Sequence, residues 1–152
     1  MLANSHVLQS PPRADMEIEL KYAVDEDLFA RLAHQRALGR FELRSAGEQE
    51  LTDRYVDTAA RDILRGGYAC RLRELAGRDS VQVTLKELGV RDGALHRREE
   101  HEVEVPRASD PGDWPESKAR DLVLQLCRGA PLQELVVIRQ RRSLHPVLRN
   151  GA

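Results

Sequence analysis

The chain has 152 residues, and 24 Lys and Arg stand against 25 Asp and Glu, so its formal net charge is −1. This length suits a single domain with one hydrophobic core of ordinary size. No apolar run reaches the roughly 18 residues that a membrane span needs, and the N-terminus lacks the apolar centre of a secretory signal, so we expect a soluble, cytoplasmic protein with no membrane partner. The near-zero charge and an aromatic content of 4% argue against nucleic-acid binding.

Two residue types are used sparingly. The two cysteines, Cys70 and Cys127, lie far apart and belong to no metal-binding or redox motif, so we expect both to be reduced and buried. The basic residues are 21 Arg and only three Lys, namely Lys21, Lys86 and Lys118. Lys21 and Lys86 stand in segments that alternate polar and apolar residues, which suggests a specific role for them.

The first part of the chain changes character near Met16. Residues 1–15 contain Ser, Asn and a Pro-Pro pair without apolar periodicity, which predicts a flexible N-terminal arm. Residues 17–22 alternate polar and apolar side chains, as a strand with two unlike faces does. Residues 25–38 have apolar residues at helical spacing after an acidic start, which predicts a helix that ends at Gly39.

The rest of the chain is mostly strand. Period-two patterns predict strands at residues 50–60, 66–75, 80–88, 96–106 and 134–144, with a second helix at 116–129. Short turns join the later strands, so antiparallel neighbours are expected. No Gly-rich phosphate-binding loop occurs.

Charges occupy the polar positions of these strands. Side chains two apart in a strand point to the same face, so each strand is predicted to have one charged face. That face comprises Glu17, Glu19, Lys21, Arg71, Arg73, Thr84, Lys86, Arg98, Glu100, Glu102, Glu104, Arg139 and Arg141. The opposite positions, among them Leu72, Val83 and Ile138, are predicted to form an apolar face. A solvated surface with weak ion pairs is the simplest interpretation of one such strand. Several strands with charged faces of this kind favour a specific function instead.

This combination of acids and bases suits a definite chemistry. Paired carboxylates supply the oxygen ligands that Mg²⁺ and Mn²⁺ prefer. Arginine offers forked donors that match phosphate oxygens, and lysine adds a compact point charge. Acids for a metal and bases for an anion on one surface favour a metal–polyphosphate complex, and the same groups serve phosphoryl transfer.

Residues 16–21 read Met-Glu-Ile-Glu-Leu-Lys and contain the pattern ExExK. With this pattern the chain resembles the CYTH domain, the superfamily of triphosphate tunnel metalloenzymes that includes class IV adenylate cyclases, thiamine triphosphatases and inorganic triphosphatases. Later motifs follow in the order of that family, at residues 53–58, 70–73, 84–86, 98–102 and 139–141. Together they span about residues 16 to 142.

The resemblance implies an α+β fold in which an eight-stranded antiparallel β-barrel with flanking helices encloses a charged tunnel. It implies that Mg²⁺ or Mn²⁺ binds to Glu17, Glu19, Glu100 and Glu102. It implies that the triphosphate is held by Lys21, Arg71, Arg73, Lys86, Arg139 and Arg141, with Glu17, Glu19 and Lys21 as catalytic residues. Arg54 and Glu104 are left open, and His101 is expected to have a structural or solvent-facing role.

Only six of the eight strands are predicted, in a CYTH-like domain at residues 16–149 that lacks the last strands of the family. A closed tunnel within one chain is therefore not expected. The open edge needs cover from the N-terminal arm, a helix, or a second copy that completes the barrel as a homodimer.

The leading functional hypothesis is metal-dependent hydrolysis of a linear triphosphate or short polyphosphate, as in an inorganic triphosphatase. A polyphosphate-binding module without turnover is the alternative, and the missing strands favour it. Adenylate cyclase-like activity would need an adenine pocket, and thiamine triphosphatase-like activity an aromatic platform, whereas the sole Trp114 is predicted in a loop. A half-barrel with a solvated face and no ligand is a further alternative.

Overall fold

The computed structural model describes residues 15–44, 47–88, 91–92, 95–107 and 109–149, and at residues 15–19, 91–92, 95–97 and 149 it describes the backbone alone. The predicted N-terminal arm lies outside the described residues, apart from Asp15. No described helix is long and apolar enough to cross a membrane.

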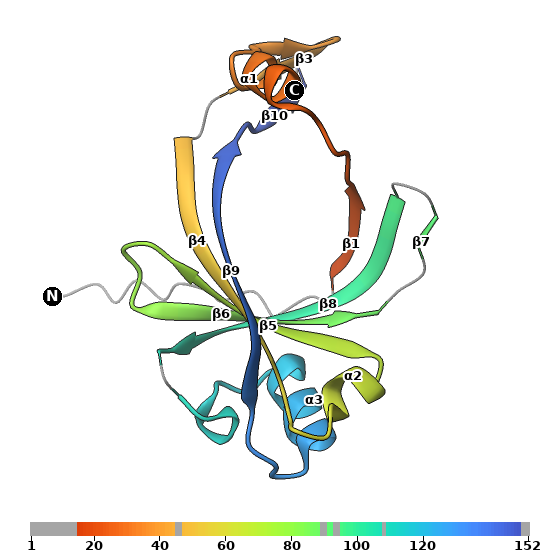
Figure 1. Cartoon of the computed structure of the whole chain (residues 1–152), viewed down its shortest axis with the longest axis vertical. Coiled ribbons are helices and arrows are strands. Elements are labelled where there is room, and N and C mark those ends of the chain that lie inside the picture. The colour runs from red at the N-terminus through yellow and green to blue at the C-terminus, as the bar shows by residue number, and fades with distance from the viewer. Residues whose placement is uncertain (1–14, 45–46, 89–90, 93–94, 108, 150–152) are drawn as a thin grey trace, which may run out of the picture.

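A curved antiparallel sheet dominates the fold (Figure 1). Its strands lie in the spatial order β1 (Asp15–Leu20), β8 (Leu95–Pro106), β6 (Ser80–Glu87), β5 (Tyr68–Leu75), β4 (Gly47–Asp57) and β9 (Gln133–Leu144), and β7 (Arg91–Asp92) pairs with β8. The six strands predicted from alternation are therefore present, and the predicted α+β class with antiparallel pairing is confirmed. Within the described residues β1 and β9 are the edges and do not pair with each other, so the sheet is not closed.

A second, smaller sheet lies at the end of the molecule where the large sheet curves away from its helices (Figure 1). It consists of β10 (Val147–Arg149), β3 (Phe41–Leu43) and β2 (Ala37–Leu38), and α1 (Glu26–Ala33) lies beside it. None of these three short strands was predicted. Strands of two or three residues are too short to display a period-two pattern.

The first predicted helix is shorter than expected. Asp25 caps α1 by accepting a hydrogen bond from the Leu28 backbone N–H at 2.7 Å, but the helix ends at Ala33, not at Leu38. Gly39 lies in the two-residue turn between β2 and β3, where its φ of +57° is in the left-handed region, which glycine adopts without steric strain. The glycine thus ends a hairpin strand and not the helix.

A four-residue helix, α2 (Asp62–Arg65), was also not predicted. The buried Asp57 carboxylate at the end of β4 accepts hydrogen bonds from the backbone N–H groups of Ile63 at 2.9 Å and Leu64 at 3.1 Å. These bonds satisfy N–H groups of the first helical turn, which have no partner within the helix. Asp57 therefore anchors α2 against the sheet.

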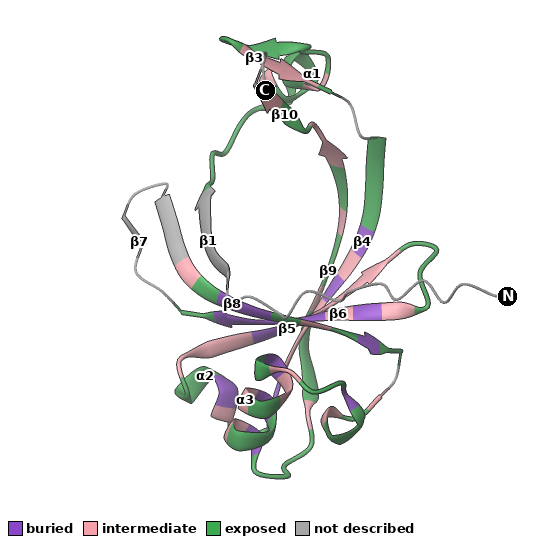
Figure 2. Cartoon of the chain, turned by 180° about the vertical axis from the view of Figure 1, so that it is seen from behind, coloured by how far each residue is buried: buried purple, intermediate pink, exposed green. Residues whose placement is uncertain are grey.

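Two of the described helices, but not α1, cover one face of the large sheet. There α2, α3 (Lys118–Cys127) and the 3₁₀ turn η1 (Pro111–Asp113) pack on the strands, and Figure 2 shows buried residues where strands and helices meet. The core comprises Ile63, Cys70, Val81, Val83, Leu85, Val105, Trp114, Val123 and Cys127. Both cysteines are free and buried, as predicted, and burial, with smaller contributions from Cys127 and Asp57, raises the pKa of Cys70 to about 12.

Candidate functional site

The strand register brings charged residues together on the face opposite the helices. Directly opposed residues of antiparallel strands point to the same side of the sheet. Arg71 lies opposite both Tyr55 and Thr84, and Thr84 lies opposite Glu102. We name this side the charged face; its described charged and amide side chains are Gln49, Asp53, Arg71, Arg73, Gln82, Lys86, Arg98, Glu100, Glu102, Glu104, Gln140 and Arg142.

Asp53 is the most deeply buried charge of this face, with 1% of its surface exposed. Arg73 binds it through two hydrogen bonds, Nε to Oδ1 at 2.7 Å and Nη2 to Oδ2 at 2.8 Å, and Gln140 donates to Oδ2 at 3.1 Å. Burial by itself would raise the pKa of Asp53, but the hydrogen bond from Arg73 and the positive charges of Arg73, Arg71 and Arg142 hold it below its usual value. Asp53 is therefore ionised and fixes Arg73 in place.

Arg71 lies beside this pair and is 7% exposed. Its Nη2 donates to Thr84 Oγ1 at 2.9 Å, and its Nε is 4.0 Å from Asp53 Oδ1. That Nε is enclosed and has no hydrogen-bond partner within the described part of the chain. Burial and the neighbouring charge of Arg73 lower the pKa of Arg71, so its surroundings do not fully compensate the cation. An anion bound on the charged face near Arg71 would help to compensate this cation.

A second ion-pair cluster lies on β6 and β8. Glu100 Oε1 accepts hydrogen bonds from Lys86 Nζ and, at 2.8 Å, from Arg98 Nε. Lys86 and Glu100 are both 9% exposed. Burial lowers the pKa of Lys86, the hydrogen bond to Glu100 opposes that shift, and the charge of Arg71 adds to it. The two clusters therefore influence each other electrostatically.

Glu102 has different surroundings from Glu100. It is exposed, and its two oxygens accept hydrogen bonds from uncharged donors, Thr84 Oγ1 at 3.1 Å and Gln82 Nε2 at 3.0 Å. Arg71 Nη2 lies farther away, 4.0 Å from Oε1. Further along β8, Glu104 pairs with the Ser80 hydroxyl. Glu102 is thus an oriented carboxylate within reach of solvent, whereas Glu100 is held by two cations.

The residues predicted on the first strand are described only in part. The backbone register places Glu17 opposite Arg98 and Glu19 opposite His96, but both side chains lie outside the described residues, so their predicted metal and catalytic roles stay predictions. Lys21 follows β1 and is exposed. Among the described side chains, no group of three or more His, Cys, Asp or Glu gathers in a way that could hold a metal ion.

The last long strand differs from expectation. In β9, Arg139 lies opposite Thr52 and Arg141 opposite Glu50, which places both on the helix side of the sheet, away from Arg71. The predicted face assignment of this strand is therefore wrong by one residue. The charged face instead receives Ile138, Gln140 and Arg142, because Ile138 and Gln140 lie opposite Asp53 and Leu51.

The error has a local cause. The segment carries arginine at 139, 141 and 142, so both phases of the alternation contain charge and the sequence does not select one. The structure selects the phase through the pairing of β9 with β4, which includes a register shift between Tyr55 and Val56. The same pairing places Arg54, whose face had been left open, on the helix side.

Sequence reasoning missed five contributors to the charged face, namely Gln49, Asp53, Gln82, Gln140 and Arg142. Asp53 could have been found from its spacing. It lies two residues before Tyr55, so the two share a face, and β4 pairs with β5, which carries Arg71 and Arg73. Gln140 has no charge and had no comparable signal. His101 lies opposite Leu85 on the helix side and is 4% exposed, which assigns it a structural role.

Comparison with known proteins was made by sequence and by structure. A family model described as "CYTH domain" matches residues 15–151. No curated protein matches the sequence. The crystal structure of a "putative adenylate cyclase" from Vibrio parahaemolyticus matches 93% of this chain with 11% sequence identity and a TM-score of 0.45, and the match covers 66% of that chain, slightly less than two thirds of its length.

Proposed function

The chain belongs to the CYTH domain family, and from this premise we propose that it binds a linear triphosphate or short polyphosphate on the charged face and hydrolyses it with a divalent metal. The family includes triphosphatases and adenylate cyclases, its domains bind triphosphate-containing substrates, and its enzymes are generally dependent on divalent metals. The choice of hydrolysis and of an inorganic substrate for this chain is the proposal.

The main support for the proposal is that Arg71, Arg73 and Lys86 lie close together on one face of the sheet. Arg71 and Arg73 share the acid Asp53, and Lys86 is near enough for the charge of Arg71 to affect its pKa. Guanidinium groups bind phosphate oxygens through paired hydrogen bonds, and an ammonium group adds a point charge. Three cations on one face can neutralise the charge that develops on a transferring phosphoryl group. Arg139 and Arg141 are not part of this proposal, because they lie on the other side of the sheet.

The acids of β8 fit a divalent metal. Glu102 is an exposed carboxylate oriented by hydrogen bonds from Gln82 and Thr84, and Glu100 lies two residues away on the same face. Glu17 and Glu19, on the neighbouring strand β1, complete the proposed set of metal ligands. The proposed catalytic residues are Glu17, Glu19 and Lys21. A donor set made only of carboxylate oxygens suits Mg²⁺ or Mn²⁺. A bound metal would neutralise phosphate charge and acidify a coordinated water.

A binding module without turnover is the second candidate. It is favoured by the unpaired edges of the described sheet, β1 and β9, since an unclosed sheet excludes water less completely than a tunnel. On this alternative the same cations bind the polyphosphate, but no phosphate is released.

Phosphate release from tripolyphosphate, pyrophosphate and ATP, with Mg²⁺ or Mn²⁺ present, separates these functions. We expect metal-dependent release from tripolyphosphate that falls about 100-fold in Glu102→Gln. Glu99→Gln is the matched control, because Glu99 is a glutamate of the same strand whose side chain lies on the helix side. Its Oε2 is 3.3 Å from His101 Nε2.

Two other outcomes count against hydrolysis, and a third counts against the proposed site. Tight tripolyphosphate binding by calorimetry without release supports the binding module, and cyclic nucleotide formation from ATP supports a cyclase. If Arg71→Ala and Lys86→Ala, checked for folding by circular dichroism, bind tripolyphosphate as tightly as the unchanged protein, the charged face is not the binding site.

A further inference from the structure

The outer edge of β9 has no partner strand within the described part of the chain. The strand is twelve residues long, and only its inner edge is paired, with β4 (Figure 1). Unpaired N–H and C=O groups along a long edge strand form a template on which another strand can pair. A further strand could therefore extend the large sheet along β9.

The middle of this edge strand is apolar and exposed. Leu135, Val136 and Ile138 are 41%, 48% and 41% exposed. Residues 133–144 contain neither proline nor lysine, two residue types that commonly keep edge strands from pairing. Val and Ile are also favoured in paired strands. A strand that paired here would remove exposed apolar surface from water, which is favourable.

The opposite edge of the sheet is different. β1 reads Asp-Met-Glu-Ile-Glu-Leu, with an acid at every second position. Two copies of β1 side by side would bring like charges together, which is destabilising. The edge suited to pairing with a copy of itself is therefore β9.

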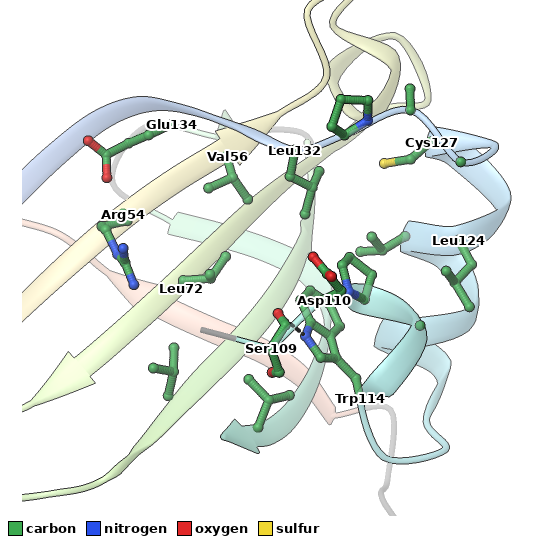
Figure 3. Close-up of a pocket in the computed structure, with 18 of the residues that line it drawn as sticks. Arg54, Val56, Leu72, Ser109, Asp110, Trp114, Leu124, Cys127, Leu132 and Glu134 are labelled. Carbon is green, nitrogen blue, oxygen red and sulfur yellow. Dashed lines mark hydrogen bonds between the residues drawn. The ribbon is translucent and has the colours of Figure 1, made fainter. Parts of the chain in front are cut away.

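The charges of β9 complement each other in an antiparallel pair. Glu134 precedes the apolar middle and Arg139 follows it, and both lie on the helix side, opposite Val56 and Thr52, because a β-bulge at Leu135 shifts the alternation. Glu134 is exposed, and Figure 3 shows its carboxylate directed away from α3. Neither charge has an ion-pair partner among the described residues. An antiparallel second copy reverses the order of the charges, so acid meets base.

Symmetry restricts the register of such a pair. A twofold axis that relates two antiparallel edge strands is perpendicular to the sheet, so each face of one copy continues into the same face of the other. Val136 and Ile138 lie on the charged face, opposite Tyr55 and Asp53, and Val137 lies on the helix side. An axis at Val137 therefore keeps every residue on its own face and aligns the apolar middles of both strands.

We propose that two copies of this chain pair antiparallel through their β9 edges, about a twofold axis at Val137. Val136 of each copy lies opposite Ile138 of the other, and Glu134 of each copy meets Arg139 of the other. The two large sheets become one continuous sheet with both charged faces on the same side.

Sedimentation equilibrium of the full chain tests this proposal. We expect a species of twice the chain mass of 17.2 kDa. Ile138→Lys places a charge in the apolar middle and should raise the dissociation constant of the dimer at least about 30-fold. Leu64→Lys, at a 52% exposed apolar position on α2, is the matched control and should leave the constant unchanged.

Charge reversal tests the antiparallel arrangement. Arg139→Glu and Glu134→Arg should each raise the dissociation constant about tenfold, because each brings like charges together between the copies. The double variant restores opposite charges and should return the constant to within about threefold of the unchanged chain. Misfolding of a single variant would not be rescued in this way.

A disulfide tests the register. In Val137→Cys the two introduced thiols face each other at the axis, and added diamide, which accepts their two hydrogen atoms, should join them. In Arg139→Cys the two thiols lie about 13 Å apart along the strands, too far for a disulfide. Both native cysteines are buried. Non-reducing electrophoresis measures the cross-linked fraction.

The proposal is overturned if the full chain is a monomer, or if Ile138→Lys, shown by circular dichroism to be folded, dimerises like the unchanged chain. It is also overturned if the double charge reversal does not restore the dimer or if Arg139→Cys cross-links as readily as Val137→Cys. A monomer whose β9 amides resist hydrogen exchange would show that another segment of the same chain covers the edge. Arg139→Glu should still bind tripolyphosphate, so this proposal and the proposed function fail separately.

Discussion

At β5, in the middle of the large sheet, the two faces are both buried, but for different physical reasons. On β5, Cys70 faces the helices and is 1% exposed, and the next residue, Arg71, faces the other way and is 7% exposed. Cys70 is stabilised by apolar packing. Arg71 loses hydration on burial, and only its partners offset that cost. The helix side thus supplies stability, whereas the charged face is suited to recognising an anion.

Removing the acid at the centre of the charged face should have the largest effect. Asp53→Ala leaves the half-buried Arg73 and the buried Arg71 without their shared acid, so we expect the free energy of unfolding to fall by about 3 to 5 kcal/mol. Urea denaturation measures the loss, and Asp79→Ala, an exposed acid, is the control. Added tripolyphosphate should restore stability to Asp53→Ala more than to the unchanged chain. A loss below about 1 kcal/mol would mean that the ion pairs contribute little.

A core truncation on the helix side should cost about 3 kcal/mol. Leu85→Ala removes a fully buried side chain and leaves a cavity among the core residues. Unlike the loss in Asp53→Ala, this loss should not respond to tripolyphosphate. Leu88→Ala, at a 52% exposed position just beyond β6, should change stability by no more than about 0.5 kcal/mol. If tripolyphosphate rescued both Leu85→Ala and Asp53→Ala equally, the two faces would not differ as described.

The register of β9 predicts a smaller difference, in binding. Arg142 belongs to the charged face and Arg139 to the helix side. We expect Arg142→Ala to weaken tripolyphosphate binding about fivefold and Arg139→Ala to leave it unchanged, as measured by calorimetry. The reverse result would restore the face assignment predicted from the sequence.

The smallest expected effect is a pH dependence. Because the pKa of Asp53 in the folded chain lies below its usual value of 3.8, its contribution to stability is complete above that value and disappears as the pH falls through the folded pKa. The free energy of unfolding should therefore decrease below about pH 4. Asp53→Asn, which keeps the shape of the side chain, should show a shallower decrease in urea denaturation over that range. Parallel curves for the two proteins would show that Asp53 does not titrate as described.

The predictable part of this fold was the part with strong local patterns. Alternation over eight or more residues identified the long strands β5, β6 and β8 and the face that Arg71, Lys86 and Glu100 share. Short elements such as α2 were not predicted, since four residues are too few to show helical periodicity. The backbone N–H groups of α2 depend instead on the carboxylate of Asp57. The end of α1 was predicted wrongly because Gly39 fits a helix stop and a hairpin turn equally well.

The sequence by itself determined that acids and bases alternate with apolar residues along the strands, since side-chain direction in a strand follows from position alone. It also determined the family, through motifs in a recognisable order. Only the tertiary structure decided which phase of β9 joins the charged face, because arginine occupies both phases and the pairing with β4 selects one. Only the tertiary structure showed that Asp53 holds Arg73, because that contact joins residues 20 positions apart through the register of two strands.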